Sequence, residues 1–319
     1  MPRARLLLAF YLFAVLQVFS FAFDDVWYSE YSARQQKYYL DEEDPELGQL
    51  YLTYTDEGPR DGKVVLLVHG VPTSSWSYRI LISILADVGF RVIAPDNLGF
   101  GNSAKPSGSQ YYELEKQGSR LLSLMEHLEI TGWVQVLHDV GGPITWEMLG
   151  IAQNRIDGLV ILNTFAYETG WDVPKFMDNP LVQFAMNKLG FRSRTIIRNT
   201  VCGMLVITET LDNDISLSGY YEPLEQGADR AYLDFLSSFP EVRKRLPYYE
   251  DILSRINIPA IIIWGANDET LVGAEAIPLL QRDLMIPDEN VFLRSDAKHL
   301  IMEELPEFIA ERITEFFPD

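Results

Sequence analysis

The stretch that decides the fold is Val134-Gln135-Val136-Leu137-His138-Asp139-Val140-Gly141-Gly142. Its first half is a short apolar run rich in β-branched residues, which is typical of a strand buried on both faces. Two glycines follow closely, and helical spacing begins at Ile144. A strand that passes into a helix through so short a turn holds its central residue in a strained conformation and exposes that side chain. We therefore expect Asp139 to project from a sharp turn between a strand and a helix.

Buried strands and helices alternate on both sides of this turn. The sequence predicts strands at residues 50–55, 64–69, 91–94, 134–137, 159–162, 260–264 and 291–293, and helices at 79–88, 114–128, 144–151 and 305–316. Such alternation indicates an α/β fold with a mostly parallel central sheet that helices cover on both faces.

The alternation stops between Phe165 and about Arg255, where the chain is aromatic-rich and mostly helical in pattern. Sheets of this kind bind ligands at the carboxyl ends of their strands. We therefore expect residues 165–255 to form a helical cap over that edge, and residues 23–164 and 256–319 to form the core.

Composition narrows the choice of partners. The chain has 319 residues, is 47% hydrophobic and carries a formal net charge of -20. An acidic surface repels nucleic acid and anionic lipid, so neither is expected as a partner, although the charge also serves solubility. The single cysteine, Cys202, excludes a disulfide within the chain.

The N-terminus has the pattern of an export signal. Arg3 and Arg5 precede an apolar run at residues 6–23, and the small residues Ser20 and Ala22 suit cleavage after Ala22. We expect residues 1–22 to be a signal peptide and the protein to be periplasmic or secreted. The alternatives are an uncleaved signal anchor, which would be the one contact with a membrane, and a buried helix.

Asp139 occupies the position that serine holds in the nucleophile elbow Gly-x-Ser-x-Gly of α/β-hydrolases. A carboxylate at a helix N-terminus is stabilised in its ionised form and can attack carbon to form an ester. An ordinary N-cap aspartate is the alternative.

The loop from His69 to Trp76 follows a buried strand, so the backbone N–H groups of Val71 and Val140 are the expected oxyanion donors. For the His69 side chain we favour a structural role.

Chain order identifies a base and an acid. Of the four histidines, His69, His127, His138 and His299, only the last lies in a loop between the last strand and the last helix. In this fold the nucleophile, the acid and the histidine follow in that order, which favours His299 as base and Asp268 as the acid that orients it. A structural histidine and a turn aspartate are the alternatives. His138 should point away from Asp139 because side chains alternate along a strand.

No motif for a metal or cofactor is present. The chain lacks His-x-x-x-His and Cys-x-x-Cys pairs, and Gly99-Phe100-Gly101 lacks the helix and acidic residue of a nucleotide fingerprint. We expect no cofactor and no metal.

Together these motifs resemble the haloalkane dehalogenases, with the epoxide hydrolases next closest. The residues that carry the resemblance are His69-Gly70-x-Pro72-Thr73-Ser74-Ser75, Tyr78-Arg79, residues 91–96, residues 99–106 and the aspartate elbow. The resemblance runs from about Leu50 to the C-terminus. It implies a two-step hydrolysis in which Asp139 forms an alkyl ester on a small apolar substrate, and in which His299, oriented by Asp268, activates water.

Two departures concern the leaving group. Haloalkane dehalogenases usually have a halide-binding Trp after the nucleophile and often Asn or Glu after His-Gly, whereas this chain has Val140 and Val71. Trp171 is the one tryptophan of the expected cap that could substitute. Trp76, Trp171 and Tyr167 are therefore candidate pocket residues.

Three hypotheses remain open. Epoxide hydrolases protonate the opening ring with cap tyrosines, and the expected cap supplies Tyr167, Tyr220, Tyr221, Tyr232, Tyr248 and Tyr249. Leu137 argues against this group, in which Gly is common at that position. We expect a dehalogenase-like hydrolase first, an epoxide hydrolase second, and third a non-catalytic protein that binds a ligand in the same pocket.

Overall fold

The computed structural model describes residues 26–172 and 193–318. Within them one sheet has the strand order β1-β2-β4-β3-β5-β6-β7-β8. Its strands are β1 (Gln36–Asp44), β2 (Gly48–Glu57), β3 (Val64–Val68), β4 (Arg91–Pro95), β5 (Trp133–Asp139), β6 (Ile156–Thr164), β7 (Ala260–Gly265) and β8 (Val291–Arg294). From β4 to β8 each neighbouring pair is parallel, and β1 and β2 are antiparallel at one edge. The expected mostly parallel α/β fold is confirmed.

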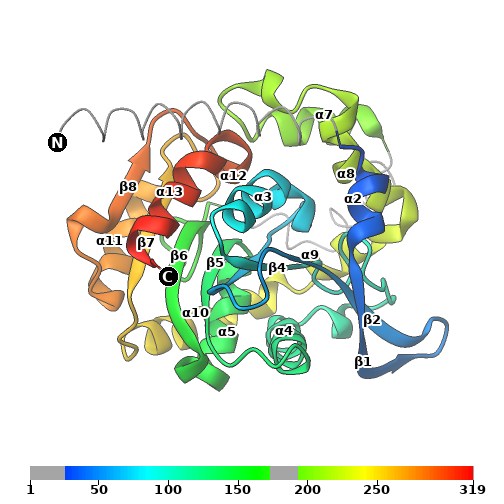
Figure 1. Cartoon of the computed structure of the whole chain (residues 1–319), viewed down its shortest axis with the longest axis horizontal. Coiled ribbons are helices and arrows are strands. Elements are labelled where there is room, and N and C mark those ends of the chain that lie inside the picture. The colour runs from blue at the N-terminus through cyan, green and yellow to red at the C-terminus, as the bar shows by residue number, and fades with distance from the viewer. Residues whose placement is uncertain (1–25, 173–192, 319) are drawn as a thin grey trace.

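Helices lie on both sides of this sheet (Figure 1). They are α2 (Tyr28–Arg34), α3 (Arg79–Asp87), α4 (Leu114–His127), α5 (Gly141–Ala152), α7 (Arg194–Cys202), α8 (Asp214–Pro223), α9 (Asp229–Leu236), α10 (Phe239–Leu253), α11 (Gly273–Leu284), α12 (Ile301–Glu304) and α13 (Pro306–Phe316). Helix α3 packs against α13, and α5 packs against both α4 and α10. The central strands β3, β5, β6 and β7 are almost wholly buried between these layers, which explains their continuous apolar sequences.

The strands and helices expected from the pattern are present, with four additions. Strand β1 was not expected because it is polar: only Leu40 and Asp44 are buried in it, since it lies at the edge of the sheet. Helices α2, α11 and the short α12 were not expected either. Helix α11 has a proline within it, Pro278, which weakens the helical signal in the sequence.

Helices α7 to α10 lie between β6 and β7 in the sequence, and we call them, together with the loops that join them, the inserted helices. They contact loops that follow the carboxyl ends of the strands: the Tyr232 hydroxyl donates to the Pro72 carbonyl, and the Trp76 indole donates to the Ser216 carbonyl. Part of the predicted cap, residues 173–192, lies outside the described residues. The division into core and cap therefore stays a prediction.

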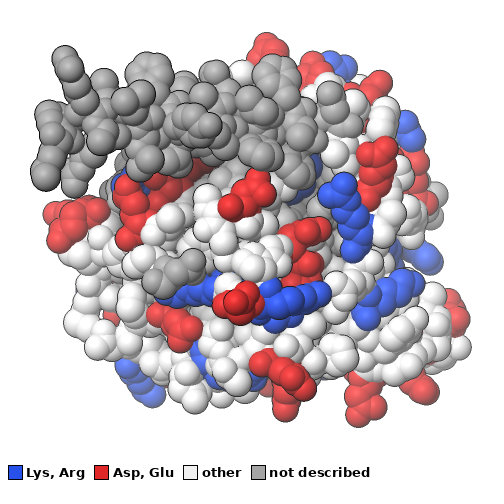
Figure 2. Space-filling model, in the orientation of Figure 1, with Lys and Arg blue, Asp and Glu red and all other residues white. Residues whose placement is uncertain are grey.

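The predicted signal peptide, residues 1–22, also lies outside the described residues, and export stays a prediction. No helix in the described part of the chain is both long and apolar enough to cross a membrane. Acidic and basic side chains are interspersed over the face of the molecule in Figure 2. The prediction that nucleic acid is not a partner therefore rests on the net charge of the chain alone.

A buried ion pair ties the inserted helices to the core. The Arg79 guanidinium lies 2.5 Å from Glu303 Oε1, and both side chains are almost fully buried. The Tyr220 hydroxyl of α8 donates to the same carboxylate oxygen at 2.6 Å. A buried charge that loses its partner is strongly destabilising, because it remains desolvated without compensation.

Replacing Glu303 by Ala should therefore lower the free energy of unfolding by about 3–5 kcal/mol, measured by urea denaturation. The matched control is Glu225→Ala, which breaks the exposed pair with Arg194 and should cost about 1 kcal/mol or less. Equal losses in the two variants would show that the buried pair does not stabilise the fold.

Candidate active site

The sharp turn at Asp139 is the centre of the candidate site. Strand β5 ends at Asp139, α5 begins two residues later, and Asp139 has a φ of 51°, in the left-handed region that non-glycine residues rarely adopt. A Cβ atom on Gly141 would overlap the Val68 carbonyl, and one on Gly142 would overlap the Thr164 hydroxyl. The two glycines therefore allow the helix to start in contact with the neighbouring strands.

The Asp139 carboxylate is held by backbone N–H groups. The Val71 N–H donates to Asp139 Oδ1 at 2.8 Å, and the Val140 N–H also hydrogen-bonds the carboxylate. Burial raises the pKa of Asp139 above its ordinary value, while the charge of His299 and these two donors act against that rise. The two donors expected from the sequence thus stabilise the ionised form of Asp139.

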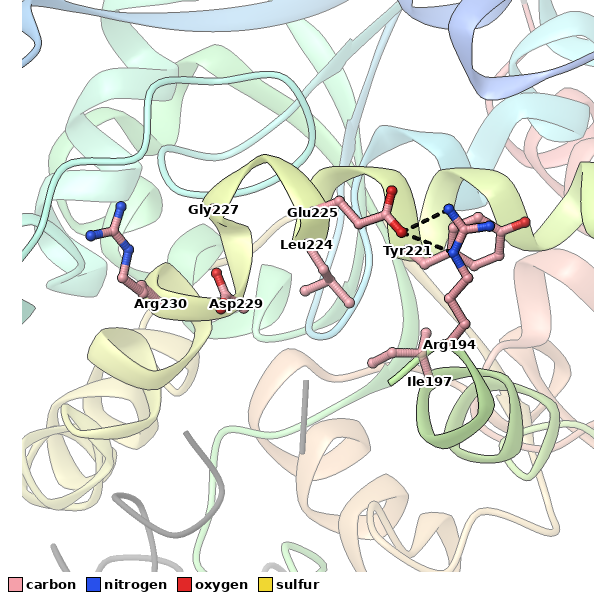
Figure 3. Close-up of a pocket in the computed structure, with 8 residues that line it drawn as sticks. All are labelled: Arg194, Ile197, Tyr221, Leu224, Glu225, Gly227, Asp229 and Arg230. Carbon is pink, nitrogen blue, oxygen red and sulfur yellow. Dashed lines mark hydrogen bonds and ion pairs between the residues drawn. The ribbon is translucent and has the colours of Figure 1, made fainter. Parts of the chain in front are cut away.

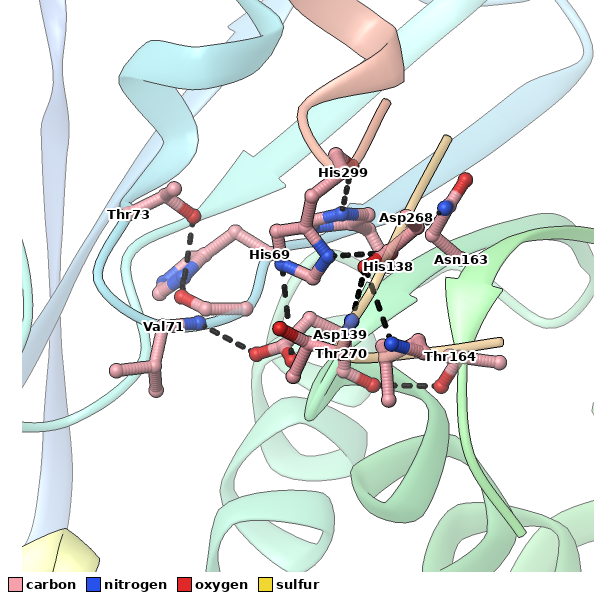
Figure 4. Close-up of polar contacts among 12 residues, drawn as sticks. His69, Val71, Thr73, His138, Asp139, Asn163, Thr164, Asp268, Thr270 and His299 are labelled. Atoms are coloured by element: carbon pink, nitrogen blue, oxygen red, sulfur yellow. Dashed lines mark hydrogen bonds and ion pairs between the residues drawn. The ribbon is translucent and has the colours of Figure 1, made fainter. Parts of the chain in front are cut away.

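The structure brings His299 and Asp268 to this carboxylate (Figure 4). His299 Nδ1 lies 2.7 Å from Asp268 Oδ2, and His299 Nε2 lies 3.9 Å from Asp139 Oδ2. The Nδ1–H therefore donates to Asp268, and the free Nε2 faces the oxygen of Asp139 that is not bonded to Val71. Asp139, Asp268 and His299 have the geometry of a catalytic triad.

Electrostatics assign a role to each member. Burial alone would lower the pKa of His299, but the charge of Asp268 and the hydrogen bond to it, with the charge of Asp139, raise the pKa above the ordinary value. Burial alone would raise the pKa of Asp268, but His299 and several hydrogen bonds hold it at about 2. Asp268 is therefore ionised at neutral pH and stabilises the imidazolium form of His299.

Asn163 is a site residue that sequence reasoning missed. Its Nδ2 donates to Asp268 Oδ2 at 2.8 Å, and its Oδ1 accepts the Gly265 N–H at 2.9 Å. The N–H groups of Thr270 and Leu271 hold the other oxygen, Oδ1. Asp268 is thus fixed by four donors, counting His299. The sequence signal that could have identified Asn163 is its position, as a polar residue near the end of the otherwise apolar strand β6.

His138 also contacts the triad, which strand alternation alone does not predict. Its ring packs against the His299 ring with centroids 4.8 Å apart, and its Nε2 donates to the His299 carbonyl at 2.8 Å. Burial, followed by the charge of His299, holds the pKa of His138 well below the ordinary value. His138 is therefore neutral, so it positions the histidine loop without adding a positive charge beside the base.

The His69 ring is structural, as expected. Its Nδ1 donates to the Gly70 carbonyl at 2.8 Å, and its Nε2 accepts the Asn97 N–H at 3.0 Å. Both ring nitrogens of His69 are hydrogen-bonded within the fold. This loop therefore contributes its backbone to the site, through the Val71 N–H.

Two of the three candidate pocket residues have other partners. The Trp76 indole donates to the Ser216 carbonyl at 2.9 Å, and the ring packs edge-on against Tyr28 and Tyr31. The Tyr167 hydroxyl donates to Asp283 at 2.9 Å, on helix α11. Neither polar group is directed at the triad by these bonds, so both residues hold elements together.

Trp171 differs from these two. Its ring stacks on Phe165 with centroids 4.2 Å apart, and its backbone pairs with Leu271, in the loop that carries Asp268. Phe165 directly follows Thr164, the β6 partner of Asp139. The indoles of the other buried tryptophans donate to acceptors, whereas the Trp171 N–H bonds no described residue. The Trp171 indole therefore has no acceptor among the described residues, and its backbone lies beside the loop of Asp268.

A separate cavity of about 490 Å³ opens among the inserted helices. Figure 3 shows the Arg194–Glu225 ion pair on its wall. Its other lining residues are Ile197, Tyr221, Leu224, Gly227, Asp229 and Arg230. None of the triad residues lines it, so it is distinct from the candidate site.

Comparison with known proteins identifies the family of this chain. The sequence model described as alpha/beta hydrolase fold matches residues 63–306. This chain belongs to the α/β-hydrolase fold family. It is 30% identical over 292 residues to a haloalkane dehalogenase of Mycolicibacterium paratuberculosis, covering 86% of this chain and 90% of that protein. It is a hydrolase of the α/β-hydrolase type.

Solved structures share the fold. The haloalkane dehalogenase DpaA from Paraglaciecola agarilytica NO2 superposes with a TM-score of 0.69 at 23% identity, covering 89% of this chain and 93% of that one. The epoxide hydrolase CorEH also has a TM-score of 0.69, at 19% identity, covering 88% and 99%. Proteins of both classes expected from the motifs thus share the fold of this α/β-hydrolase.

The raised pKa of His299 can be tested directly by NMR titration of the histidine ring protons. In the native protein His299 should titrate above about 6.5. In Asp268→Asn its pKa should fall, because only the charge of Asp139 then acts against burial. His69, whose pKa burial lowers, is the internal control and should be unchanged. An equal His299 pKa in both proteins would contradict the pairing.

Proposed function

We propose that this hydrolase uses Asp139 as a nucleophile to form a covalent alkyl ester, and that it is a haloalkane dehalogenase acting on small apolar substrates. One observation carries the proposal: the Val71 N–H binds Oδ1 of Asp139, while Oδ2 faces Nε2 of His299. One carboxylate oxygen is thus held, and the other is directed at the space beside the base.

In the first step Asp139 Oδ2 attacks the carbon that bears the halogen. A carbon–oxygen bond forms, the carbon–halogen bond breaks, and the halide leaves with the bonding electrons. The reaction needs an ionised Asp139, which the Val71 and Val140 N–H groups favour.

In the second step His299 takes a proton from water, and the water oxygen attacks the carbonyl carbon of the ester. Negative charge develops on Oδ1, where the Val71 N–H stabilises it; one such donor is worth about 3 kcal/mol. The ester bond then breaks, the alcohol leaves with the proton from His299, and Asp139 releases the second proton of the water to solvent, which restores the carboxylate.

Esterification also prepares the base. The charge of Asp139 is one of the contributions that raise the pKa of His299. Because the ester is neutral, that contribution disappears when the intermediate forms. The pKa of His299 therefore falls when a neutral imidazole is needed to accept a proton from water.

The leaving group needs a donor, and Val140 has none on its side chain. Trp171 supports the proposal here, since its indole N–H bonds no described residue and its ring lies on Phe165, beside the nucleophile strand. We propose that this N–H stabilises the departing halide.

The role of Trp171 can be tested with Trp171→Phe, which keeps the ring stacked on Phe165 and removes the N–H. We expect the kcat/KM for a chloroalkane to fall about 10- to 100-fold, the value of one hydrogen bond to a charged group. The matched bromoalkane should lose less, since bromide accepts hydrogen bonds more weakly. Equal rates in the native protein and the variant would exclude Trp171 as the donor.

Epoxide hydrolysis is the alternative, and one observation favours it. The Tyr232 hydroxyl of α9 donates to the Pro72 carbonyl, one residue after Val71. A tyrosine at that place can protonate the oxygen of an opening epoxide if it exchanges this carbonyl for the substrate. The same Asp139 ester and the same base would serve.

The decisive experiment removes the base. His299→Phe should stall the second step, so that incubation with bromoalkanes adds the mass of the alkyl group, without halogen, to a peptide that contains Asp139. Intact-protein mass spectrometry followed by peptide mapping measures this. The double variant Asp139→Ala/His299→Phe is the control and should gain no mass.

The other outcomes also discriminate. An adduct that keeps the epoxide oxygen, obtained with styrene-type epoxides, would replace dehalogenation by epoxide hydrolysis. Ligand binding without any adduct on His299→Phe, and without turnover by the native protein, would support a non-catalytic binding protein.

A further inference from the structure

The backbone of His299 is bonded to the inserted helices. Its N–H donates to the Met204 carbonyl at 3.0 Å, and the N–H of the next residue, Leu300, donates to the same carbonyl at 3.2 Å. Met204 follows helix α7, about ninety residues earlier in the chain. The segment Gly203–Ile207, which we call the docking segment, therefore contacts the candidate base directly.

Glu304 joins the same two pieces of chain a second time. Its Oε2 accepts the N–H of Lys298, the residue before His299, at 2.6 Å. Its Oε1 accepts the N–H of Val206, in the docking segment, at 2.6 Å. Hydrogen bonds to an ionised group are stronger than neutral ones. One carboxylate thus bridges the loop of the base and the docking segment.

Apolar burial holds only part of this segment. Leu205 is buried, but Val206 and Ile207 are 44% and 58% exposed. The second half of the segment is therefore held chiefly by hydrogen bonds to Glu304, which also receives the Ile207 N–H. Loss of this carboxylate should release that half without opening the core.

Among the described residues, every other polar contact of His299 comes from the core. Asp268 holds its side chain and His138 holds its carbonyl. The Met204 carbonyl is the one contact with His299 in these described hydrogen bonds that comes from the inserted helices. Movement of the docking segment would therefore shift His299 while the Asp139 carboxylate, held by Val71 and Val140, stays in place.

From these contacts we propose that Glu304 is a positioning residue that docks residues 203–207 onto the loop of His299, so that the base is aligned only when this segment is seated. The inference rests on the proposed role of His299 in the second step. A shift of about 1 Å in a reacting group can reduce a rate by about two orders of magnitude, so a small displacement is sufficient. Nucleophilic attack by Asp139 does not require this alignment.

The first test needs no substrate. In Glu304→Ala, hydrogen exchange followed by mass spectrometry should be faster in peptides covering residues 203–207 and 298–304 together, with strands β5 and β6 unchanged. The control Glu307→Ala removes the same charge from an exposed position nearby and should leave both peptides unchanged. Unchanged exchange in Glu304→Ala, or faster exchange throughout the protein, would overturn the docking role.

The second test separates the two chemical steps in a single turnover with a bromoalkane. Glu304→Ala should slow ester hydrolysis about tenfold or more and leave ester formation within about twofold of the native rate, so that the Asp139 ester accumulates. Glu304→Gln keeps one acceptor oxygen and should lie between the two proteins. A residue that merely stabilises the fold would lower both rates, and that result would overturn the proposal.

The two proposals can fail separately. If His299→Phe traps no ester with any substrate, the proposed chemistry fails, and the exchange experiment alone decides the docking role. If His299→Phe traps the ester but Glu304→Ala hydrolyses it at the native rate, the chemistry stands and the positioning role of Glu304 is wrong.

Discussion

The structure of the site depends on one constraint, the left-handed turn at Asp139. A non-glycine residue with a φ of 51° is strained, and the strain persists because β5 on one side and α5 on the other fix both ends of the turn. Gly141 and Gly142 then let α5 start against Val68 and Thr164. The result is a carboxylate that projects at the carboxyl edge of the sheet, beside the backbone donors of the β3 loop.

The electrostatics follow from that position. Two buried carboxylates, Asp139 and Asp268, lie on either side of one imidazole, and their charges keep the pKa of His299 high despite its burial. Removal of one of those charges by esterification favours the neutral base. The same arrangement of Asp139, His299 and Asp268 therefore suits both proposed steps, because the proposed ester on Asp139 itself lowers the pKa of His299.

His299 is fixed from three directions that belong to different parts of the fold. Asp268, after β7, bonds its ring; His138, in β5, bonds its carbonyl; and Met204, from the inserted helices, bonds its N–H. The described hydrogen bonds of Asp139 and Asp268 come from the core. Alignment of the base is thus the property most sensitive to how the inserted helices sit, with Glu304 as the connecting group.

The sequence by itself determined the mostly parallel sheet, because buried strands are continuous apolar runs, and it predicted Asp139, Asp268 and His299 as a candidate triad from their order along the chain. Edge strand β1 was not predicted because its sequence is polar. Only the tertiary structure decided the other contacts, including those of Asn163 and His138. These contacts join residues far apart in sequence, often through backbone carbonyls, which every residue has and which therefore leave no sequence signature.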